Sequence, residues 1–466
     1  MTSDGTVDGN VDGTVVTIGI DIGTTSVTAI AADAAGRIVA RARVPHALLS
    51  SHAGELAHDA AEAWWHGPRL ALAEVLERAG EVSVAGICVA AMVPSLCAVG
   101  PDGIPISDGL LYGDARGAGG DAVGDPSSSG ELVRFLAHLV AEHPDAAGYW
   151  PAQAVANASL CGVGGIDTVT AMTTLPLFDF TGWDAAVAAG AGLDDTARLP
   201  VIVSGSTALG TVSVAGDAPL NGGTIDAYGE QLVAGADGDG DVLVILGATL
   251  IVWAVVPEWR EIDGLWTVPH TAPGLVLVGG PSNAGGLFVN WVKRLAGRPA
   301  IPDAATIAAL DTLAPDRVPV WQPYLRGERV PLHDADRRAS LHDLDIGHGP
   351  EALMRAGYEA SGFAARHQLD LAGLSPTRIV ATGGGAQDPG WVQALADATG
   401  LPVDVVGTPE GGALGAAYQA RVTAGLEADS SAAGRWGRVA HRVEPDPRWA
   451  DAVARRYERY RALSDG

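Results

Sequence analysis

The chain has 466 residues, more than a single hydrophobic core organises, so two or three domains are expected. A composition of 47% hydrophobic and 18% charged residues is typical of compact globular proteins and excludes a disordered chain. The formal net charge of −26 argues against binding to nucleic acid or to anionic membranes, which requires clustered lysine and arginine; the scattered acids favour solubility.

The first half of the chain predicts a sheet and a covering helix. Residues 1–14 read as a loose tail, and apolar side chains at helical spacing over 59–78 favour an α/β architecture. A Gly-, Ser- and Asp-rich loop is expected at 117–130, a helix at 132–142 and extended chain with turns at 199–209. The expected strands, which are β-branched and separated by glycine turns, are 15–20, 27–32, 37–44 and 84–91.

The second half repeats this pattern. Two apolar runs flank Gly247-Ala248-Thr249, as the first two strands flank Gly23-Thr24-Thr25. A strand, a glycine turn and a strand at the head of each half imply a duplicated core with a cleft between the copies, where ligands tend to bind. The expected elements of this half are strands at 242–246, 250–255, 275–278, 378–382 and 402–406, and helices at 286–295, 350–370, 391–399 and 411–423.

The cysteines and the apolar runs indicate a cytoplasmic protein. The three cysteines form no C-x-x-C pair, which fits a reducing compartment and gives no zinc site. The polar, acidic first fourteen residues differ from a signal peptide. The longest apolar stretch, 242–256, is too short for a membrane span and is interrupted by Gly247.

The turn after the first strand predicts an anion site. Gly23 permits a tight turn whose amides form a concave nest, and hydroxyl side chains follow it as further donors. Asp21, at the strand end, can hold Mg²⁺ through water. An ordinary hairpin with an exposed aspartate is the alternative, and the absence of a G-x-x-x-x-G-K-[ST] run excludes a P-loop.

Three further motifs carry candidate chemistry. Asp226, in the Gly-rich loop 222–228, can accept a proton from a substrate hydroxyl, although an aspartate there is equally a turn former. Asp114 and Arg116 lie two apart in chain expected to be extended, so they can hold polyol hydroxyls or each other. The glycines of 383–385, between a strand and a helix, leave bare backbone for a flat ligand or a phosphate.

These motifs together resemble the FGGY carbohydrate kinases, which have the actin-like, ribonuclease H-like ATPase fold. The resemblance covers roughly residues 15–425. The motifs that carry it, in family order, are Asp21–Ser26, Leu111–Arg116, Gly223–Ala227, Gly280–Gly286, Gly327–Pro331, Gly383–Ala386 and Gly412–Ala417.

The resemblance implies transfer of the γ-phosphoryl group of ATP to a hydroxyl of a sugar or polyol, with ATP and Mg²⁺ as cofactors. It implies that Asp226 is the catalytic base and that Asp21 and Asp226 are the metal-linked carboxylates. Met92, Asp114, Arg116 and Asp226 fall at the sugar. The residues implied to bind the nucleotide are Gly23, Thr24, Thr25, Ser26, Gly247, Thr249, Gly384, Gly385 and Ala386.

The implied architecture is α/β, with two ribonuclease H-like (actin-like ATPase) domains and an interdomain cleft. The expected partners are a small sugar or polyol and ATP, with no nucleic acid and no membrane; a homodimer is left open. The expected segments are a tail at 1–14, a sugar-binding domain at 15–236, a nucleotide-binding domain at 237–425 and an extension with a helix at 426–466.

Three positions depart from the pattern of the family. Ala248 replaces a hydroxyl residue of the second phosphate turn, where Thr249 can substitute. Met92-Val93-Pro94 replaces the Met-His-Gly of bacterial xylulokinases, and Ala227 replaces an asparagine. The favoured acceptor is a pentulose such as D-xylulose. Ribulose, fuculose, gluconate, glycerol and erythritol are alternatives, as is a nucleotide-binding regulatory relative without activity.

Overall fold

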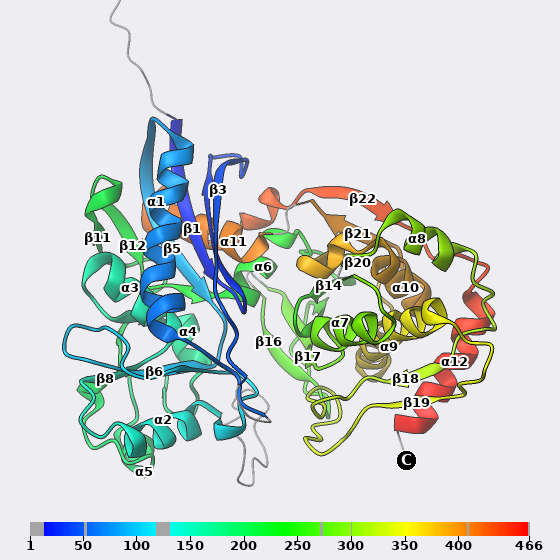
Figure 1. Ribbon diagram of the computed structural model, residues 1–466. Helices are drawn as coiled ribbons and strands as arrows, with labels where there is room; N and C mark the ends of the chain where they lie inside the picture. The colour runs from blue at the N-terminus through cyan, green and yellow to red at the C-terminus, as the bar shows by residue number, and fades with distance from the viewer. Residues whose placement is uncertain are drawn as a thin grey trace, which may run out of the picture. The chain divides into compact units, whose positions relative to one another are not determined.

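The computed structural model describes residues 14–50, 54–117, 131–270, 274–299, 301–407 and 410–464. They form two compact units (Figure 1). Unit 1 contains the described residues up to 225 together with 416–428, and unit 2 contains those of 226–415 and 429–464. The expected tail up to residue 13, and residues 118–130 of the loop expected at 117–130, lie outside the described residues.

The sheet of unit 1 is built on the expected meander. Its three strands pair antiparallel, and the next strand runs parallel to the first. The strand order is β11-β12-β5-β1-β2-β3, with β13 beside the end of β5. The strands are β1 (Thr14–Ile22), β2 (Ser26–Ala32), β3 (Ile38–Pro45), β5 (Val82–Ala91), β11 (Ala208–Val212), β12 (Ala218–Asn221) and β13 (Thr224–Ile225).

The helix expected at 59–78 is divided. A π-helical turn, Ala61–His66, precedes α1 (Gly67–Ala79), which packs on β2 and β3 (Figure 1). Pro68 lacks an amide hydrogen, so it fits the first turn of a helix and not a helix interior. Gly67 lies so close to the sheet that an added Cβ would approach Cγ2 of Val27 to 2.7 Å.

A second layer of unit 1 is built from residues 57–58 and 95–203, where the sequence analysis predicted few elements. Short strands form a sheet of order β4-β7-β6-β8, and a core around Phe135, Leu136 and Tyr149 covers it. The helix expected at 132–142 is confirmed. The elements are β4 (Ala57–His58), β6 (Ser95–Val99), β7 (Gly109–Leu111), β8 (Gly148–Trp150), β9 (Gly165–Asp167), β10 (Val201–Val203), α2 (Glu131–Glu142), α3 (Ala152–Cys161), α4 (Thr168–Met172) and α5 (Ala185–Gly190).

The sheet of unit 2 repeats the core of the sheet of unit 1. Three antiparallel strands are again followed by two strands parallel to the first, in the order β16-β17-β15-β14-β20-β21-β22. The duplicated core predicted from the two glycine turns is therefore confirmed. The strands are β14 (Asp241–Leu246), β15 (Leu250–Val256), β16 (Trp266–Pro269), β17 (Val276–Ser282), β20 (Arg378–Thr382), β21 (Val403–Val406) and β22 (Val439–Val443).

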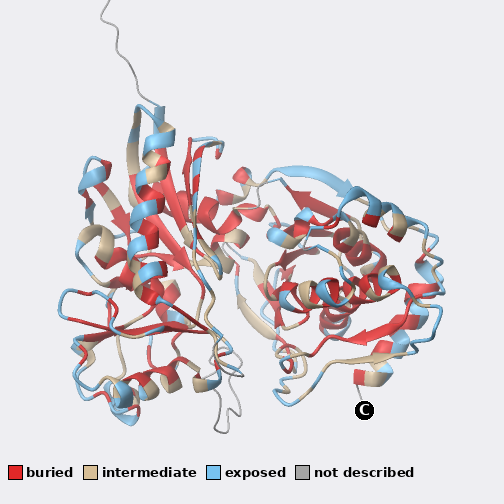
Figure 2. Ribbon diagram, in the orientation of Figure 1, coloured by how far each residue is buried: buried red, intermediate tan, exposed pale blue. Residues whose placement is uncertain are grey.

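In unit 2, helices α7, α8, α10 and α12 pack against α9, which is buried along most of its length (Figure 2). A small antiparallel pair, β18 (Val320–Gln322) and β19 (Ser340–His342), accompanies them. Within the described ranges, no helix has both the length and the apolarity needed to cross a bilayer. The helices from residue 226 onward are α6 (Asp226–Ala234), α7 (Gly286–Leu295), α8 (Ala304–Asp311), α9 (Pro350–Ala372), α10 (Pro389–Thr399), α11 (Gly411–Thr423) and α12 (Ala450–Ser464). Helix α11 continues into unit 1 at residue 416.

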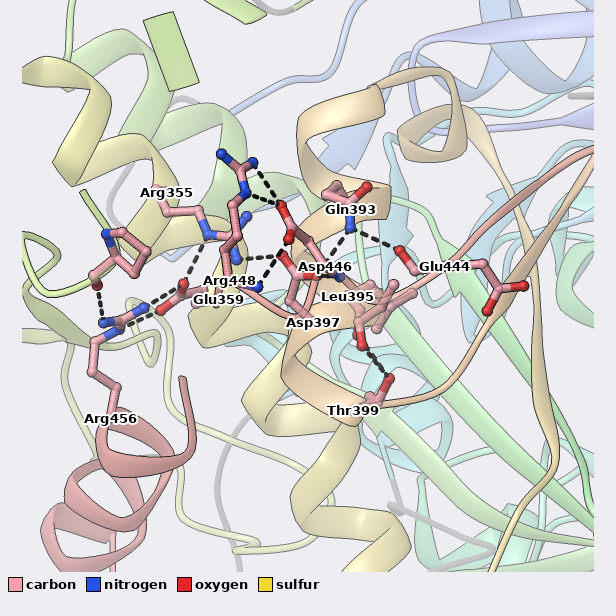
Figure 3. A network of polar contacts seen from close by, with 12 residues as sticks. Arg355, Glu359, Gln393, Leu395, Asp397, Thr399, Glu444, Asp446, Arg448 and Arg456 are labelled. Carbon is pink, nitrogen blue, oxygen red and sulfur yellow. Dashed lines mark hydrogen bonds and ion pairs between the residues drawn. The ribbon is translucent and has the colours of Figure 1, made fainter. Parts of the chain in front are cut away.

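Buried ion pairs attach the C-terminal extension to unit 2 (Figure 3). Glu359 of α9 accepts hydrogen bonds from Arg456 of α12 at 2.6 and 2.8 Å and from Arg355 at 2.7 Å. Arg355 also donates to Asp397 of α10 at 2.7 Å, and its guanidinium lies 3.9 Å from the ring centre of Trp449. Helices α9, α10 and α12 are thus joined by charged groups that are almost fully buried.

Candidate functional site

The first glycine turn joins β1 to β2 as predicted. The amide of Gly23 donates to the carbonyl of Ser26 at 3.0 Å, and Ser26 already belongs to β2. Thr25 is exposed, whereas Gly23 and Thr24 are half-buried. Asp21 lies two residues before this turn, near the end of β1, and is half-buried.

A histidine that the sequence analysis did not single out holds the first turn in place. The Nε2 of His58 lies 2.9 Å from the carbonyl oxygen of Thr24, and the indole of Trp64 donates to its Nδ1 at 3.0 Å. Because the indole is only a donor, Nδ1 is the acceptor and Nε2 carries the hydrogen. Burial, aided by repulsion from His46, lowers the pKa of His58 to about 4, so the ring is neutral at pH 7.

Three parallel strands of unit 1 end at the same level of the sheet. Ile22 of β1 and Ile225 of β13 both pair with Ala91 of β5. Asp226 follows β13 directly and is the first residue of α6. Burial raises the pKa of the Asp226 carboxyl, although the amide of Ala227, which donates to it at 2.6 Å, acts in the opposite direction.

The side-chain amides of Gln153 and Asn157, both on α3, hold the backbone segment that leads to Asp226. The buried Gln153 donates to the carbonyls of Ala91 and Thr224, at 3.1 and 3.2 Å. Asn157, one turn later, donates to the carbonyl of Gly222 at 2.9 Å. The ends of β5 and β13 are therefore held to one another by a side chain that the sequence analysis missed, because its partners lie 62 and 71 residues away.

Met92, which directly follows β5, is only 2% exposed, and its side chain belongs to the apolar core of unit 1. A thioether in such a place packs against other apolar groups. Contact of this side chain with a sugar remains a prediction, and its burial does not favour it.

The extended chain expected at Asp114 and Arg116 is not found: residues 115–117 form a 3₁₀ turn. The carboxylate of Asp114 accepts hydrogen bonds from the backbone amides of Arg116 and Leu56, at 2.8 and 2.7 Å. The bond from Arg116, two residues on, is an Asx-type contact and turns the chain. The Arg116 guanidinium binds it in fork geometry at 2.9 and 2.7 Å. Burial alone would raise the pKa of Asp114, but the hydrogen bonds from Arg116 and Leu56 hold it below its ordinary value.

The second glycine turn, 247–249, joins β14 to β15 and lies against the start of α7. The amides of Gly286 and Leu287 donate to the carbonyls of Gly247 and Ala248, at 2.8 and 3.0 Å. A Cβ added at Gly285 would lie 2.3 Å from backbone atoms of Thr249 and Leu250. Glycine at this position is therefore required by the close approach of the turn.

The loop 383–386 lies beside the second glycine turn. β14 and β20 run parallel, with Ile245 opposite Thr382, so both segments follow strand ends at one edge of the sheet. Gly383 has a φ of +86°, and a Cβ added there would lie 3.0 Å from the carbonyl oxygen of Leu246. A Cβ added at Gly385 would lie 2.3 Å from the ring of Trp391. Gly384 is exposed with open space around it, which leaves its backbone accessible to a ligand.

Glu328 and Arg329 connect a distant segment to the second turn. The buried Glu328 carboxylate accepts from the hydroxyl of Ser282 at 2.9 Å and from the amides of Asn283 and Arg329 at 3.0 and 2.7 Å. Burial raises the pKa of Glu328 to about 7. The guanidinium of Arg329 donates to the hydroxyl of Thr249 at 3.1 Å.

Two domains of one known family match the chain. The N-terminal domain of the FGGY family of carbohydrate kinases matches residues 16–119, and the C-terminal domain of the same family matches residues 242–424. The chain belongs to the FGGY family of carbohydrate kinases. The first glycine turn lies in the N-terminal match. The second turn, Arg329 and the loop 383–386 lie in the C-terminal match.

Known relatives of this FGGY chain include xylulose kinases. That of Escherichia coli is 36% identical over 144 residues, which span 30% of this chain and 29% of the relative. That of Streptomyces rubiginosus is 27% identical over 481 residues, covering 94% and 95% of the two chains. The solved xylulose kinase from Rhodospirillum rubrum has a TM-score of 0.78 at 27% identity, over 96% of this chain and 98% of that one. The expected α/β class with two ribonuclease H-like domains is confirmed.

Proposed function

We propose that this FGGY chain transfers the γ-phosphoryl group of ATP to a hydroxyl of a sugar or polyol, with a pentulose such as D-xylulose as the favoured acceptor. The observation that carries this proposal is the placement of Asp226. Its half-buried carboxyl directly follows a strand end of unit 1 and has a raised pKa. A carboxylate whose pKa is raised by burial is a better proton acceptor.

Asp226 acts as general base in this proposal. It accepts the proton of the sugar hydroxyl while the hydroxyl oxygen forms a bond to the γ-phosphorus. The bond from that phosphorus to the β–γ bridging oxygen breaks, and ADP leaves with the electron pair. Gln153, by fixing both Ala91 and Thr224, holds the chain that presents the base.

The carboxylates present fit a metal ion that is held mainly by the nucleotide. Among the described residues, no three His, Cys, Asp or Glu side chains gather as a metal-binding group. Mg²⁺ often uses one or two carboxylates, with phosphate oxygens and waters as its other ligands. We assign Asp21 and Asp226 to this role; when bound, the ion would neutralise charge on the phosphates.

The glycine turns and the loop 383–386 are proposed to hold the nucleotide. The first turn offers the hydroxyls of Thr24, Thr25 and Ser26, and the second offers that of Thr249. The exposed backbone of Gly384 suits close approach of a flat group. Asp114 orients Arg116, so we assign contact with the sugar chiefly to the guanidinium of Arg116, whose side chain is 24% exposed.

Replacement of the base tests the proposal. In Asp226→Asn, sugar-dependent release of ADP should fall below about one thousandth of the wild-type rate, while the affinity for ATP stays close to that of the wild type. Asp303→Asn is the matched control, because Asp303 caps the start of α8 outside the proposed site. Turnover that persists in Asp226→Asn would remove Asp226 from the role of base.

A coupled assay of ADP release across acceptors decides the substrate. D-xylulose, ribulose, fuculose, gluconate, glycerol and erythritol are the set to compare, each by kcat/KM. The regulatory alternative, motivated by Ala248, predicts ATP binding without release of ADP on addition of any sugar. The hydroxyl of Thr249 and the adjacent Arg329 provide donors at the second turn and favour the kinase.

A further inference from the structure

Arg329 brings a positive charge to the second glycine turn from 80 residues away in the sequence. Its Nη2 donates to Oγ1 of Thr249 at 3.1 Å, and the side chain is half-buried. The guanidinium has five donors in a fixed plane and no acceptor, and this geometry matches the oxygens of a phosphate group.

The backbone of Arg329 is fixed from several sides. Glu328 accepts the Arg329 amide at 2.7 Å and holds the end of β17 through Ser282 and Asn283. The next amide, that of Val330, donates to the carbonyl of Pro281 at 3.1 Å. β17 pairs with β15, and Ser282 at the end of β17 lies opposite Leu250 at the start of β15. The segment that carries Arg329, which is held to the end of β17, therefore lies next to the second turn, which leads into β15.

The contact also sets the direction of the Thr249 hydroxyl. Because the guanidinium can only donate, the hydroxyl oxygen of Thr249 is the acceptor. Its own hydrogen is therefore available to be donated to another oxygen. The pair thus presents a charged donor and a neutral donor at a turn whose carbonyls, those of Gly247 and Ala248, are occupied by α7.

This inference rests on the proposed function: we propose that Arg329 and Thr249 together bind the β- or γ-phosphate of ATP at the turn 247–249. Arg329 supplies the charge, and it orients the hydroxyl of Thr249. Ala248 then needs no side-chain donor, because the missing hydroxyl of the second turn is replaced by a guanidinium from another segment.

Nucleotide binding by the full chain tests this assignment. Arg329→Gln should raise the dissociation constant for ATP about ten-fold or more, as expected for loss of a charged hydrogen bond, and should leave that for AMP unchanged. Arg329→Lys, which keeps the charge but loses the fork, should fall between Arg329→Gln and the wild type. The exposed Arg326→Gln removes one charge from the same segment and serves as the matched control.

A double-mutant cycle separates phosphate binding from support of the fold. Thr249→Val should also weaken ATP binding, and the double variant Thr249→Val, Arg329→Gln should lose less than the product of the two single effects. Equal weakening of ATP and AMP, or unchanged affinity in Arg329→Gln, would overturn the assignment.

The outcomes of this experiment are distinct from those for the proposed function. If the wild type binds ATP but releases no ADP with any sugar, the kinase proposal fails, and the ATP and AMP affinities still decide the role of Arg329. If sugar-dependent ADP release is found and Arg329→Gln binds ATP as the wild type does, only the role of Arg329 is lost. A wild type that binds no ATP overturns both.

Discussion

The contact of His58 with Thr24 shows how one buried side chain fixes the backbone of the first glycine turn. The neutral ring donates to a backbone carbonyl and accepts from Trp64, so both nitrogens are used. A neighbouring ring, His46, has its centre 4.4 Å away, and burial lowers its pKa as well. Protonation of His58 would remove the acceptor for the indole and place a charge in the core.

We expect His58 to make the protein sensitive to mild acid. The unfolded side chain has a pKa of 6.5 and the folded one about 4, so the unfolded chain binds more protons between these values. The stabilisation is fully present above about pH 6.5 and is lost as the pH falls towards 4, at most roughly 3 kcal/mol. A glutamine in His58→Gln can keep both hydrogen bonds but does not titrate. The free energy of unfolding of this variant, measured in urea, should therefore vary less between pH 7 and pH 5 than that of the wild type.

The exposed His66→Gln is the control for this measurement. It should retain the pH dependence of the wild type. If His58→Gln and the wild type lose the same stability between pH 7 and pH 5, the acid sensitivity belongs to other groups.

At the scale of elements, the second turn packs directly against the start of α7, because Gly285 and Gly286 have no side chains to separate the two segments. Gly285→Ala would place a methyl group 2.3 Å from the backbone of Thr249 and Leu250, so the turn must move. We expect kcat/KM for ATP to fall by about ten-fold or more, and KM for the sugar to change less. Gly190→Ala, at the end of α5 with open space around it, should behave as the wild type.

The sequence predicted those elements whose pattern is local. The strands at both glycine turns, and helix 411–423 with its small residues, have their expected positions because apolar periodicity and glycine fix them. The chain at 114–116 was expected to be extended, which was wrong, because a hydrogen bond from the Arg116 amide to the Asp114 carboxylate turns it. Arg329 and His58 could not be assigned, since their partners lie 80 and 34 residues away.

At the scale of the whole molecule, the ion-pair network of α9, α10 and α12 makes the C-terminal extension part of unit 2 (Figure 3). Burial alone would raise the pKa of Glu359, but Arg456 and Arg355 hold it below the ordinary value. Its contribution to stability is therefore present above the pKa of an unfolded glutamate and is lost as the pH falls below it.

Glu359→Gln leaves two buried arginines without their shared charge. We expect it to lower the free energy of unfolding by about 3–5 kcal/mol, measured in urea at pH 7. The control Arg455→Gln breaks an ion pair with Asp316 in which both side chains are mostly exposed. It should change the free energy of unfolding by less than about 1 kcal/mol. Equal effects of the two substitutions would show that the buried network does not anchor the extension.

The return of the chain to unit 1 at 416–428 has a consequence for biosynthesis. Cys88 and Ala90 of the first sheet pack against Ala416 and Ala420. On the ribosome, nearly the whole polypeptide must emerge before this face of the sheet is covered. We therefore expect a nascent chain that ends before residue 416 to leave that face of the sheet uncovered, and the N-terminal half to complete its folding only after the rest of the chain is made.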